Sequence, residues 1–157
     1  MDARLNYFES PVAEKFIKYL SSAGRVVHDS SLPNAVVQLV EVRASQINGC
    51  ALCLDMHFKD AIAGGESPER LNMVAVWREA TVFSDAERAA LELTEQGTRL
   101  ADAAGGVSDD AWAEASKYFD DDQLAALVAA IASINTWNRL NVITRQPGGD
   151  YKPGQWG

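Results

Sequence analysis

The segment QINGCALCLDMH, residues 46–57, carries two cysteines and a histidine at the boundary between two expected helices. Before it, apolar residues recur at offsets of three and four from Pro33 onward, which predicts a helix that ends at Gly49. After Gly49 the helical spacing continues as far as Gly64-Gly65, where two glycines cannot sustain a helix. The segment therefore predicts two consecutive helices that meet at Gly49.

Capping signals predict further helices on both sides of this pair. These helices are expected to begin at Ser10-Pro11, Ser67-Pro68, Ser84, Ser108 and Asp120. We expect the helix that follows Ser84 to end at Gly105-Gly106. The last helix carries alanines beside its apolar stripe, which allow close approach of neighbours, so we expect it to be central or to lie in a subunit contact. Since no alternating pattern of useful length predicts a strand, the expected fold is all-α with six to seven helices.

Size and charge narrow the class of protein. A chain of 157 residues suits one domain, which we assign to residues 1–146, and residues 147–157 are expected to form an irregular C-terminal tail. The formal net charge of -8, without a basic run, opposes binding to nucleic acid or anionic lipid. No apolar run approaches the roughly 20 residues that cross a bilayer, and the first residues lack a leader pattern. We therefore expect a cytoplasmic protein with neither nucleic acid nor membrane as a partner.

Cys50, Cys53 and His57 share one face of the predicted helix, because residues three and four apart are neighbours on a helix. Cys50 begins this helix, where unpaired amides and the helix dipole favour a thiolate. Cys53 lies one turn from both other residues, so it can form a disulfide with Cys50 and give its proton to His57. In a reducing compartment, such closely spaced cysteines indicate redox or metal chemistry.

Two thiols and a base supply what peroxide reduction requires. Attack of a thiolate on the O–O bond leaves a sulfenic acid, which the second thiol converts to a disulfide. The imidazole can protonate the departing alkoxide. Electrostatics at the helix start favour Cys50 as the attacking thiol, whereas the nearby His57 favours Cys53, and the residues alone leave that choice open.

The stretch ASQINGCALCLDMH, with the Lys59-Asp60-Ala61 that follows, resembles the core of AhpD-like alkylhydroperoxidases in the carboxymuconolactone decarboxylase family. The stretches VWREATVFSDAERAALELTE, from Val76, and INTWNRLNV, from Ile134, are similar to the family's later helices. The resemblance implies an all-α fold that assembles into a homo-oligomer, a trimer or hexamer, without a bound cofactor. It also implies a redox-active disulfide between Cys50 and Cys53, with Cys53 as the peroxidatic thiol beside His57.

One position departs from the family's pattern. Members with the peroxidase proton relay usually carry a glutamate twelve residues before the first cysteine, and this chain has Gln38 there. An amide can orient a histidine but cannot shuttle a proton at neutral pH. Glu41 lies one turn further along the same helix and is a candidate substitute, its alternative role being a solvated surface carboxylate. We include both in the candidate site with Cys50, Cys53 and His57.

We therefore expect a thiol-dependent peroxidase that reduces a small hydroperoxide and takes electrons from an external dithiol reductant. An alternative in the same superfamily is thiol–disulfide exchange or sensing with weak peroxidase activity. A third hypothesis is a structural zinc site in which Cys50, Cys53 and His57 are joined by His28 or a carboxylate. Zinc-binding Cys-x-x-Cys pairs usually lie on knuckle turns, whereas all three residues lie here on one predicted helix.

Overall fold

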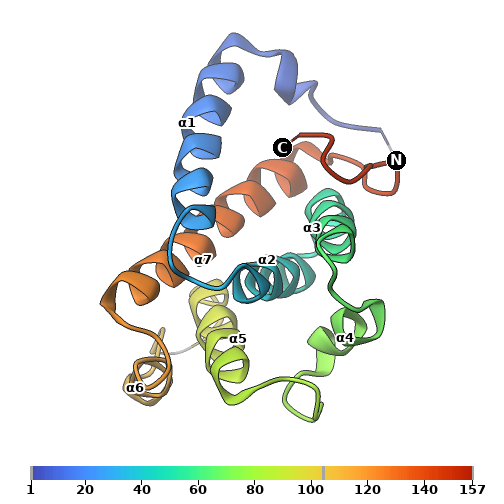
Figure 1. The fold of residues 1–157 in the computed structure, drawn as a ribbon. Helices are drawn as coiled ribbons and strands as arrows, with labels where there is room; N and C mark the ends of the chain where they lie inside the picture. The colour runs from blue at the N-terminus through green and yellow to red at the C-terminus, as the bar shows by residue number, and fades with distance from the viewer. Residues whose placement is uncertain (1, 104, 157) are drawn as a thin grey trace.

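The computed structural model describes residues 2–103 and 105–156, and within them the chain forms seven α-helices, two short 3-10 helices and no strand (Figure 1). The α-helices are α1 (Pro11–His28), α2 (Asn34–Asn48), α3 (Ala51–Ala63), α4 (Pro68–Met73), α5 (Asp85–Thr98), α6 (Asp109–Ala115) and α7 (Asp121–Thr144). The 3-10 helices are η1 (Tyr7–Glu9) and η2 (Val74–Val76). The prediction of an all-α fold with six to seven helices is confirmed.

The junction between α2 and α3 forms where the sequence predicts it. Gly49 has φ 64° and ψ 32°, the left-handed conformation that a glycine adopts without strain. The N–H of Cys50 donates to the carbonyl of Ser45 at 3.0 Å, which closes the end of α2. Cys50 then acts as the N-cap of α3, since its sulfur accepts the N–H of Cys53 at 3.3 Å.

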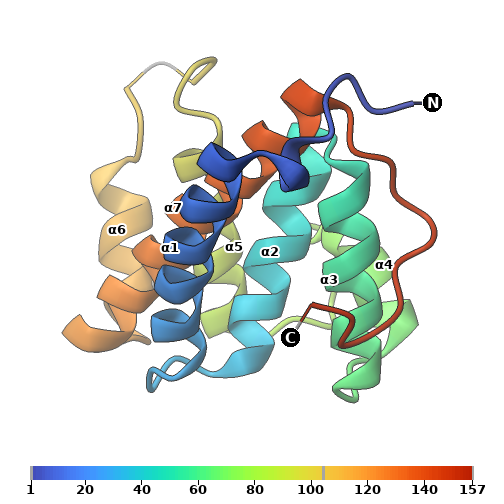
Figure 2. The same ribbon diagram turned by 90° about the horizontal axis from the view of Figure 1, so that it is seen from above.

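Helix α2 lies at the centre of the fold and packs against α3, α5 and α7 (Figure 2). It is apolar on two sides, and each side belongs to a separate core cluster. One cluster includes Val37 and Val40 with both cysteines and the buried face of α7. The other includes Leu39 and Val42 with Leu71 of α4 and Leu91 of α5. Helix α7 contacts α1, α2, α3 and α5, which confirms its expected central position.

The expected end of the helix after Ser84 is wrong. Helix α5 ends at Thr98, and the described residues between it and Ser108 form turns or extended chain. Leu100 is exposed, so another turn of helix would have buried no apolar side chain. Gly97 lies within α5, where a Cβ would lie 3.2 Å from a methyl carbon of Ile131, and it permits close packing of α5 on α7.

The C-terminal segment is irregular but tied to α3. Residues 147–156 form no helix and run along the outer side of α3 (Figure 2). Asp55 accepts the N–H groups of Gly149 at 2.7 Å and Tyr151 at 3.2 Å. Lys59 donates to the carbonyl oxygens of the same two residues, each at 2.9 Å. These contacts hold the tail on the face of α3 that carries Asp55 and Lys59.

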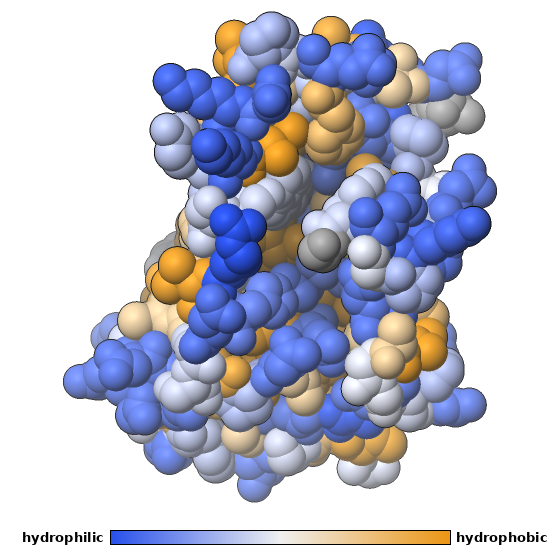
Figure 3. Space-filling view, turned by 45° about the horizontal axis from the view of Figure 1, so that its top comes forward, coloured by the Kyte–Doolittle hydropathy of each residue, from blue (hydrophilic) through white to orange (hydrophobic). Residues whose placement is uncertain are grey.

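Some large apolar side chains remain at the surface. On α1 they follow one side of the helix at intervals of four, three and seven, and they are Val12, Phe16, Tyr19 and Val26. Figure 3 shows one face of the molecule, on which polar side chains surround apolar patches and which is hollowed near its middle. Within the described ranges, no helix combines the length and the apolar content that crossing a membrane requires.

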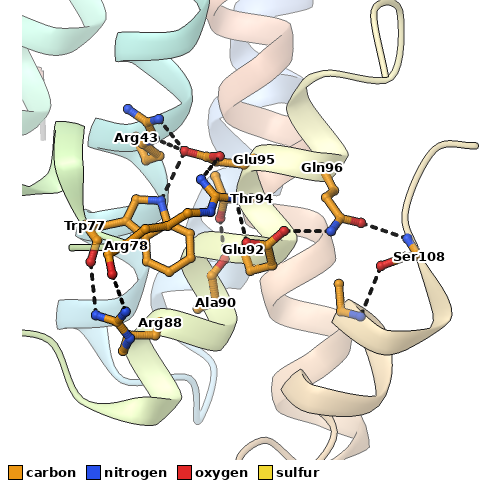
Figure 4. Close-up of polar contacts among 11 residues, drawn as sticks. Arg43, Trp77, Arg78, Arg88, Ala90, Glu92, Thr94, Glu95, Gln96 and Ser108 are labelled. Atoms are coloured by element: carbon orange, nitrogen blue, oxygen red, sulfur yellow. Dashed lines mark hydrogen bonds and ion pairs between the residues drawn. The ribbon is translucent and has the colours of Figure 1, made fainter. Parts of the chain in front are cut away.

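A buried carboxylate ties α2, α5 and the turn after η2 together (Figure 4). Glu95 accepts from Arg43 Nε at 2.7 Å and from Trp77 Nε1 at 3.0 Å. It also pairs with Arg78, whose guanidinium lies 4.5 Å from the ring centre of Trp77. The indole and both guanidinium groups are thus held by one side chain.

Replacing Glu95 by leucine would leave Arg43 and the Trp77 N–H without their acceptor. We expect a loss of about 3–5 kcal/mol in the free energy of unfolding, as is typical when one partner of a buried ion pair is removed. Urea unfolding followed by circular dichroism measures the loss. Glu92→Ala is the matched control, because Glu92 pairs with the half-exposed Arg78 and should contribute no more than about 1 kcal/mol. Similar losses in both variants would contradict a structural role specific to Glu95.

Candidate active site

Both cysteines lie in the core at the start of α3. Cys50 is 2% exposed and Cys53 is 1% exposed, and both thiols are free. The N-cap contact points the sulfur of Cys50 at the backbone N–H of Cys53. The two thiols are therefore neighbours on one turn and are separated from bulk solvent by surrounding apolar side chains.

Helix α7 supplies a hydrogen-bond donor to this pair. The side-chain amide of Asn141 donates to the sulfur of Cys53 at 3.2 Å. One turn earlier, Asn138 donates to Ser45 Oγ at 3.1 Å and accepts from Asn48 at 2.8 Å. These asparagines were not among the site residues predicted from the sequence. Asn135, Asn138 and Asn141 recur every third residue along α7, and that spacing was the signal that could have identified them.

His57 and Glu41 form the second part of the site. Nδ1 of His57 lies 3.1 Å from Oε2 of Glu41, which reaches across from α2. The Nε2 atom of His57 is buried and has no hydrogen-bond partner in the part of the chain that the structure describes. This nitrogen is free to exchange a proton with a thiol or with a small molecule bound beside it.

Glu41 also faces a second imidazole. Nε2 of His28, at the last residue of α1, lies 3.5 Å from Oε1 of Glu41. The Glu41 side chain is 14% exposed, so it is not the solvated surface carboxylate that the sequence left open as its alternative role. Glu41 instead lies between two histidines from two other helices.

Gln38 is not brought into this cluster. Its Nε2 lies 3.2 Å from the position that a Cβ at Gly64 would occupy, just beyond the C-terminal end of α3. Cys50 caps the opposite end of α3. The helix has 13 residues, and at 1.5 Å for each residue its two ends lie roughly 20 Å apart. Of the two residues proposed from the sequence, Glu41 is the one that meets His57.

The surroundings shift the pKa values of the two thiols in opposite directions. The pKa of Cys53 is lowered to about 6. A hydrogen bond from Cys50 has the largest effect on this pKa. Hydrogen bonds from Asn141 and Asn138 and the charge of His57 also lower it, and together these effects outweigh burial. The same thiol–thiol contact and burial raise the pKa of Cys50. Cys53 is therefore the thiol that ionises first, in agreement with its proximity to His57 rather than with the helix-start argument for Cys50.

Glu41 and His57 stabilise each other as an ion pair. Burial alone would raise the pKa of Glu41, but the charge of His57 and hydrogen bonds from His28 and His57 lower it to about 2. Burial disfavours the protonated form of His57, yet the charge of Glu41 and its hydrogen bond raise the pKa of this imidazole. At neutral pH, Glu41 is ionised and His57 holds its proton more firmly than a free imidazole does.

The zinc hypothesis has no set of ligands in this structure. Among residues 2–103 and 105–156, no three His, Cys, Asp or Glu side chains gather in a way that could hold a metal ion. His28, the expected fourth ligand, pairs with Glu41 instead of the cysteines. The geometry of the cluster suits proton and thiol chemistry.

Comparison with known proteins identifies the family of this chain. Residues 12–96 match the model of the carboxymuconolactone decarboxylase family. The chain belongs to this family. An uncharacterised family relative, YdfG of Bacillus subtilis, is 34% identical over 142 residues, which cover 90% of this chain and 94% of that protein. The resemblance expected from the sequence is confirmed.

Solved structures extend the comparison to the whole fold. A protein of unknown function from Agrobacterium tumefaciens, which has been related to the antioxidant defence protein AhpD, has a TM-score of 0.87 and 33% identity. The match covers 96% of this chain and all of that chain, 100%. The debrominase Bmp8 has a TM-score of 0.77 at 14% identity, covering 87% of this chain and 72% of that one. Proteins with this fold therefore include enzymes of more than one kind.

We expect Asn141→Ala to raise the pKa of Cys53, because it removes a hydrogen bond that favours the thiolate. The measurement is the ultraviolet absorbance of the thiolate during a pH titration. A Cys50→Ser background leaves one thiol, so the signal has a single source. Thr136→Ala, at a half-buried position of α7 where the hydroxyl bonds the Ala132 carbonyl, is the control and should leave the midpoint unchanged. An unchanged midpoint for Asn141→Ala would show that the amide does not stabilise this thiolate.

Proposed function

We propose that the protein is a thiol-dependent peroxidase that reduces small hydroperoxides through Cys53 and Cys50. The proposal rests on one cluster of side chains. In it the Cys53 sulfur accepts a hydrogen bond from the Asn141 amide, one turn from the His57–Glu41 pair. The lowered pKa of Cys53 supplies a nucleophile at neutral pH. The similarity to a protein related to AhpD supports the same chemistry.

Cys53, His57 and Cys50 each have a separate role in the proposed reaction. The Cys53 thiolate attacks one peroxide oxygen, the O–O bond breaks, and a sulfenic acid and an alkoxide form. His57 Nε2 gives its proton to the alkoxide, which leaves as an alcohol. The Cys50 thiol then attacks the sulfenic sulfur, a disulfide forms and water leaves. An external dithiol returns both cysteines to the thiol form by exchange and leaves as a disulfide.

Burial of the two sulfurs limits what reaches them. With exposures of 2% and 1%, neither sulfur presents a surface to a bulky substrate. A small hydroperoxide needs only a brief local opening of the surrounding side chains. The proposed substrate class is therefore small hydroperoxides. The alternative function is thiol–disulfide exchange with sensing, and the thiol counting described below distinguishes the two.

The homo-oligomer implied by the family resemblance stays a prediction. The exposed apolar stripe on α1, residues 12–26, supports self-association, because such a stripe costs less free energy when a second apolar surface covers it. Sedimentation equilibrium gives the subunit number. A trimer or hexamer would agree with the prediction, and a monomer at micromolar concentration would contradict it.

We expect Cys53→Ser to abolish peroxide consumption, because it removes the attacking thiolate. Cys50→Ser should allow one slow turnover that stops at a sulfenic acid, which a dimedone-type reagent traps. Stopped-flow mixing with one equivalent of peroxide, combined with thiol counting, measures both. The unaltered protein should lose both thiols of each chain in one fast phase. Full turnover by Cys53→Ser would reverse the assignment, and loss of thiols only with disulfide reagents would favour exchange or sensing.

We expect Glu41→Gln to slow peroxide reduction by about 10-fold to 100-fold, within the range of positioned acid–base groups. Glu41 raises the pKa of His57, so its loss should also move the alkaline limb of the pH–rate profile to lower pH. Gln38→Ala provides the comparison, since the Gln38 amide lies against Gly64 and should change the rate far less. A larger loss for Gln38→Ala would return the relay to the position expected from the family's pattern.

A further inference from the structure

A row of side-chain amides ends beside the two cysteines, and the reaction proposed above does not use it. Asn48 donates to Oδ1 of Asn135 at 2.9 Å and to Oδ1 of Asn138 at 2.8 Å. Asn138 in turn donates to Ser45 Oγ at 3.1 Å. Asn138 is 0% exposed, so water is not an alternative partner for this amide.

Two groups of fixed hydrogen-bonding role orient this row. The Ile131 carbonyl can only accept, and Nδ2 of Asn135 donates to it at 2.9 Å. The Arg139 guanidinium can only donate, and it faces Oδ1 of Asn135 at 3.3 Å. Oδ1 of Asn135 therefore faces Asn48, which must present its NH2 group. Because the same NH2 group meets Asn138, Asn138 must present its Oδ1 to Asn48 and turn its own NH2 group away.

The NH2 group of Asn138 faces the thiol pair. One of its two hydrogens is directed at Ser45 Oγ, which leaves the other for a second acceptor. The carbonyl of Ser45 accepts the N–H of Cys50 at 3.0 Å, so this amide lies where α3 begins. Hydrogen bonds from Asn138 reach both thiols, Cys50 and Cys53. The Asn141 amide, one turn later on α7, donates to Cys53.

Cys50 is the thiol that most needs a donor. A hydrogen bond with Cys53 and burial raise the pKa of Cys50, and hydrogen bonds from the Cys53 N–H and from Asn138 act against them. Cys53, by contrast, has a pKa of about 6 and accepts a hydrogen bond from Asn141 as well. A donor on the Cys50 sulfur favours its thiolate. It therefore matters most at the step in which Cys50 becomes the nucleophile.

We propose that Asn138 is a catalytic residue of disulfide formation and donates a hydrogen bond to the Cys50 sulfur as this thiol attacks. Asn48 is the positioning residue that orients the Asn138 amide. The inference rests on the proposed function. In this step the S–H bond of Cys50 breaks, an S–S bond to Cys53 forms, and the S–O bond of the sulfenic acid breaks. The departing hydroxide takes the Cys50 proton and leaves as water. The peroxide has already supplied the oxidation, so no further oxidant takes part.

The first test titrates Cys50 alone, in a Cys53→Ser background. Nuclear magnetic resonance of cysteine labelled with carbon-13 at Cβ follows the ionisation, and the signal has a single source. Asn138→Ala should move the ionisation to higher pH, because it removes a donor that favours the thiolate. Asn141→Ala is the matched control. It removes the same group one turn later on α7, where the amide donates to Cys53, and should leave the Cys50 titration unchanged.

Asn48→Ala keeps this test decisive if circular dichroism shows that Asn138→Ala does not fold. Asn48 is half-buried, and its replacement leaves the Asn138 amide in place while removing the group that orients it. We expect a smaller shift of the Cys50 titration in the same direction. An unchanged titration in Asn48→Ala alone would overturn the positioning role of Asn48. An unchanged titration in each of the two variants that folds would overturn the role of Asn138.

The second test isolates the rate of disulfide formation. The reduced protein is mixed with one equivalent of hydrogen peroxide at pH 8, where Cys53 stays ionised, and dimedone competes with Cys50 for the sulfenic acid. Asn138→Ala should form the disulfide about 10-fold more slowly, as expected for one hydrogen bond to a charged group. Dimedone should then trap more sulfenic acid. Thr136→Ala, elsewhere on α7, should behave as the unaltered protein does.

The two tests separate this inference from the proposed function. An unaltered protein that loses no thiols to peroxide would overturn the proposed function, while the Cys50 titration still decides whether Asn138 favours that thiolate. Normal peroxide turnover with the same rate of disulfide formation in Asn138→Ala would overturn the inference alone. Ionisation of Cys50 at higher pH, together with slower disulfide formation in Asn138→Ala, supports it.

Discussion

The left-handed turn at Gly49 is the constraint on which the site depends. It ends α2 and lets α3 begin at once, capped by the sulfur of Cys50. The two helices then lie side by side with opposite directions (Figure 2). Glu41 and His57 lie eight residues before and eight residues after Gly49, so the same turn places them opposite each other. A residue with a Cβ at this φ would strain the junction and with it the contact.

Polar contacts within an apolar core set the position of α7 against this pair of helices. Asn48 donates to both Asn135 and Asn138, and Asn138 donates to Ser45. A buried amide without partners is costly, so these hydrogen bonds favour one register of α7 over others that bury as much apolar surface. That register brings Asn141 to Cys53. The hydrogen bonds of Asn135 and Asn138 therefore help to position Asn141 beside Cys53.

Local spacing in the sequence was sufficient for the cysteine helix but not for its partners. The three/four rule places Cys50, Cys53 and His57 together because one helix carries all of them. The contacts of Asn141 and His28 depend on how α7 and α1 cross α2, which no spacing along the chain specifies. Counting residues from a family pattern pointed to Gln38, whereas the packing of α2 against α3 turns Glu41 towards His57. The end of α5 was predicted wrongly for a related reason. Tertiary burial, and not the next glycine pair, decides where that helix ends.

The charges around Cys53 explain why burial does not raise the pKa of this thiol. A buried charge is tolerated when opposite charges and hydrogen-bond donors surround it. The Cys53 thiolate and Glu41 bring two negative charges, and protonated His57 brings one positive charge. Asn141 adds a hydrogen bond to the Cys53 sulfur at 3.2 Å. His57, held by Glu41, is therefore the positive charge that acts on the Cys53 sulfur.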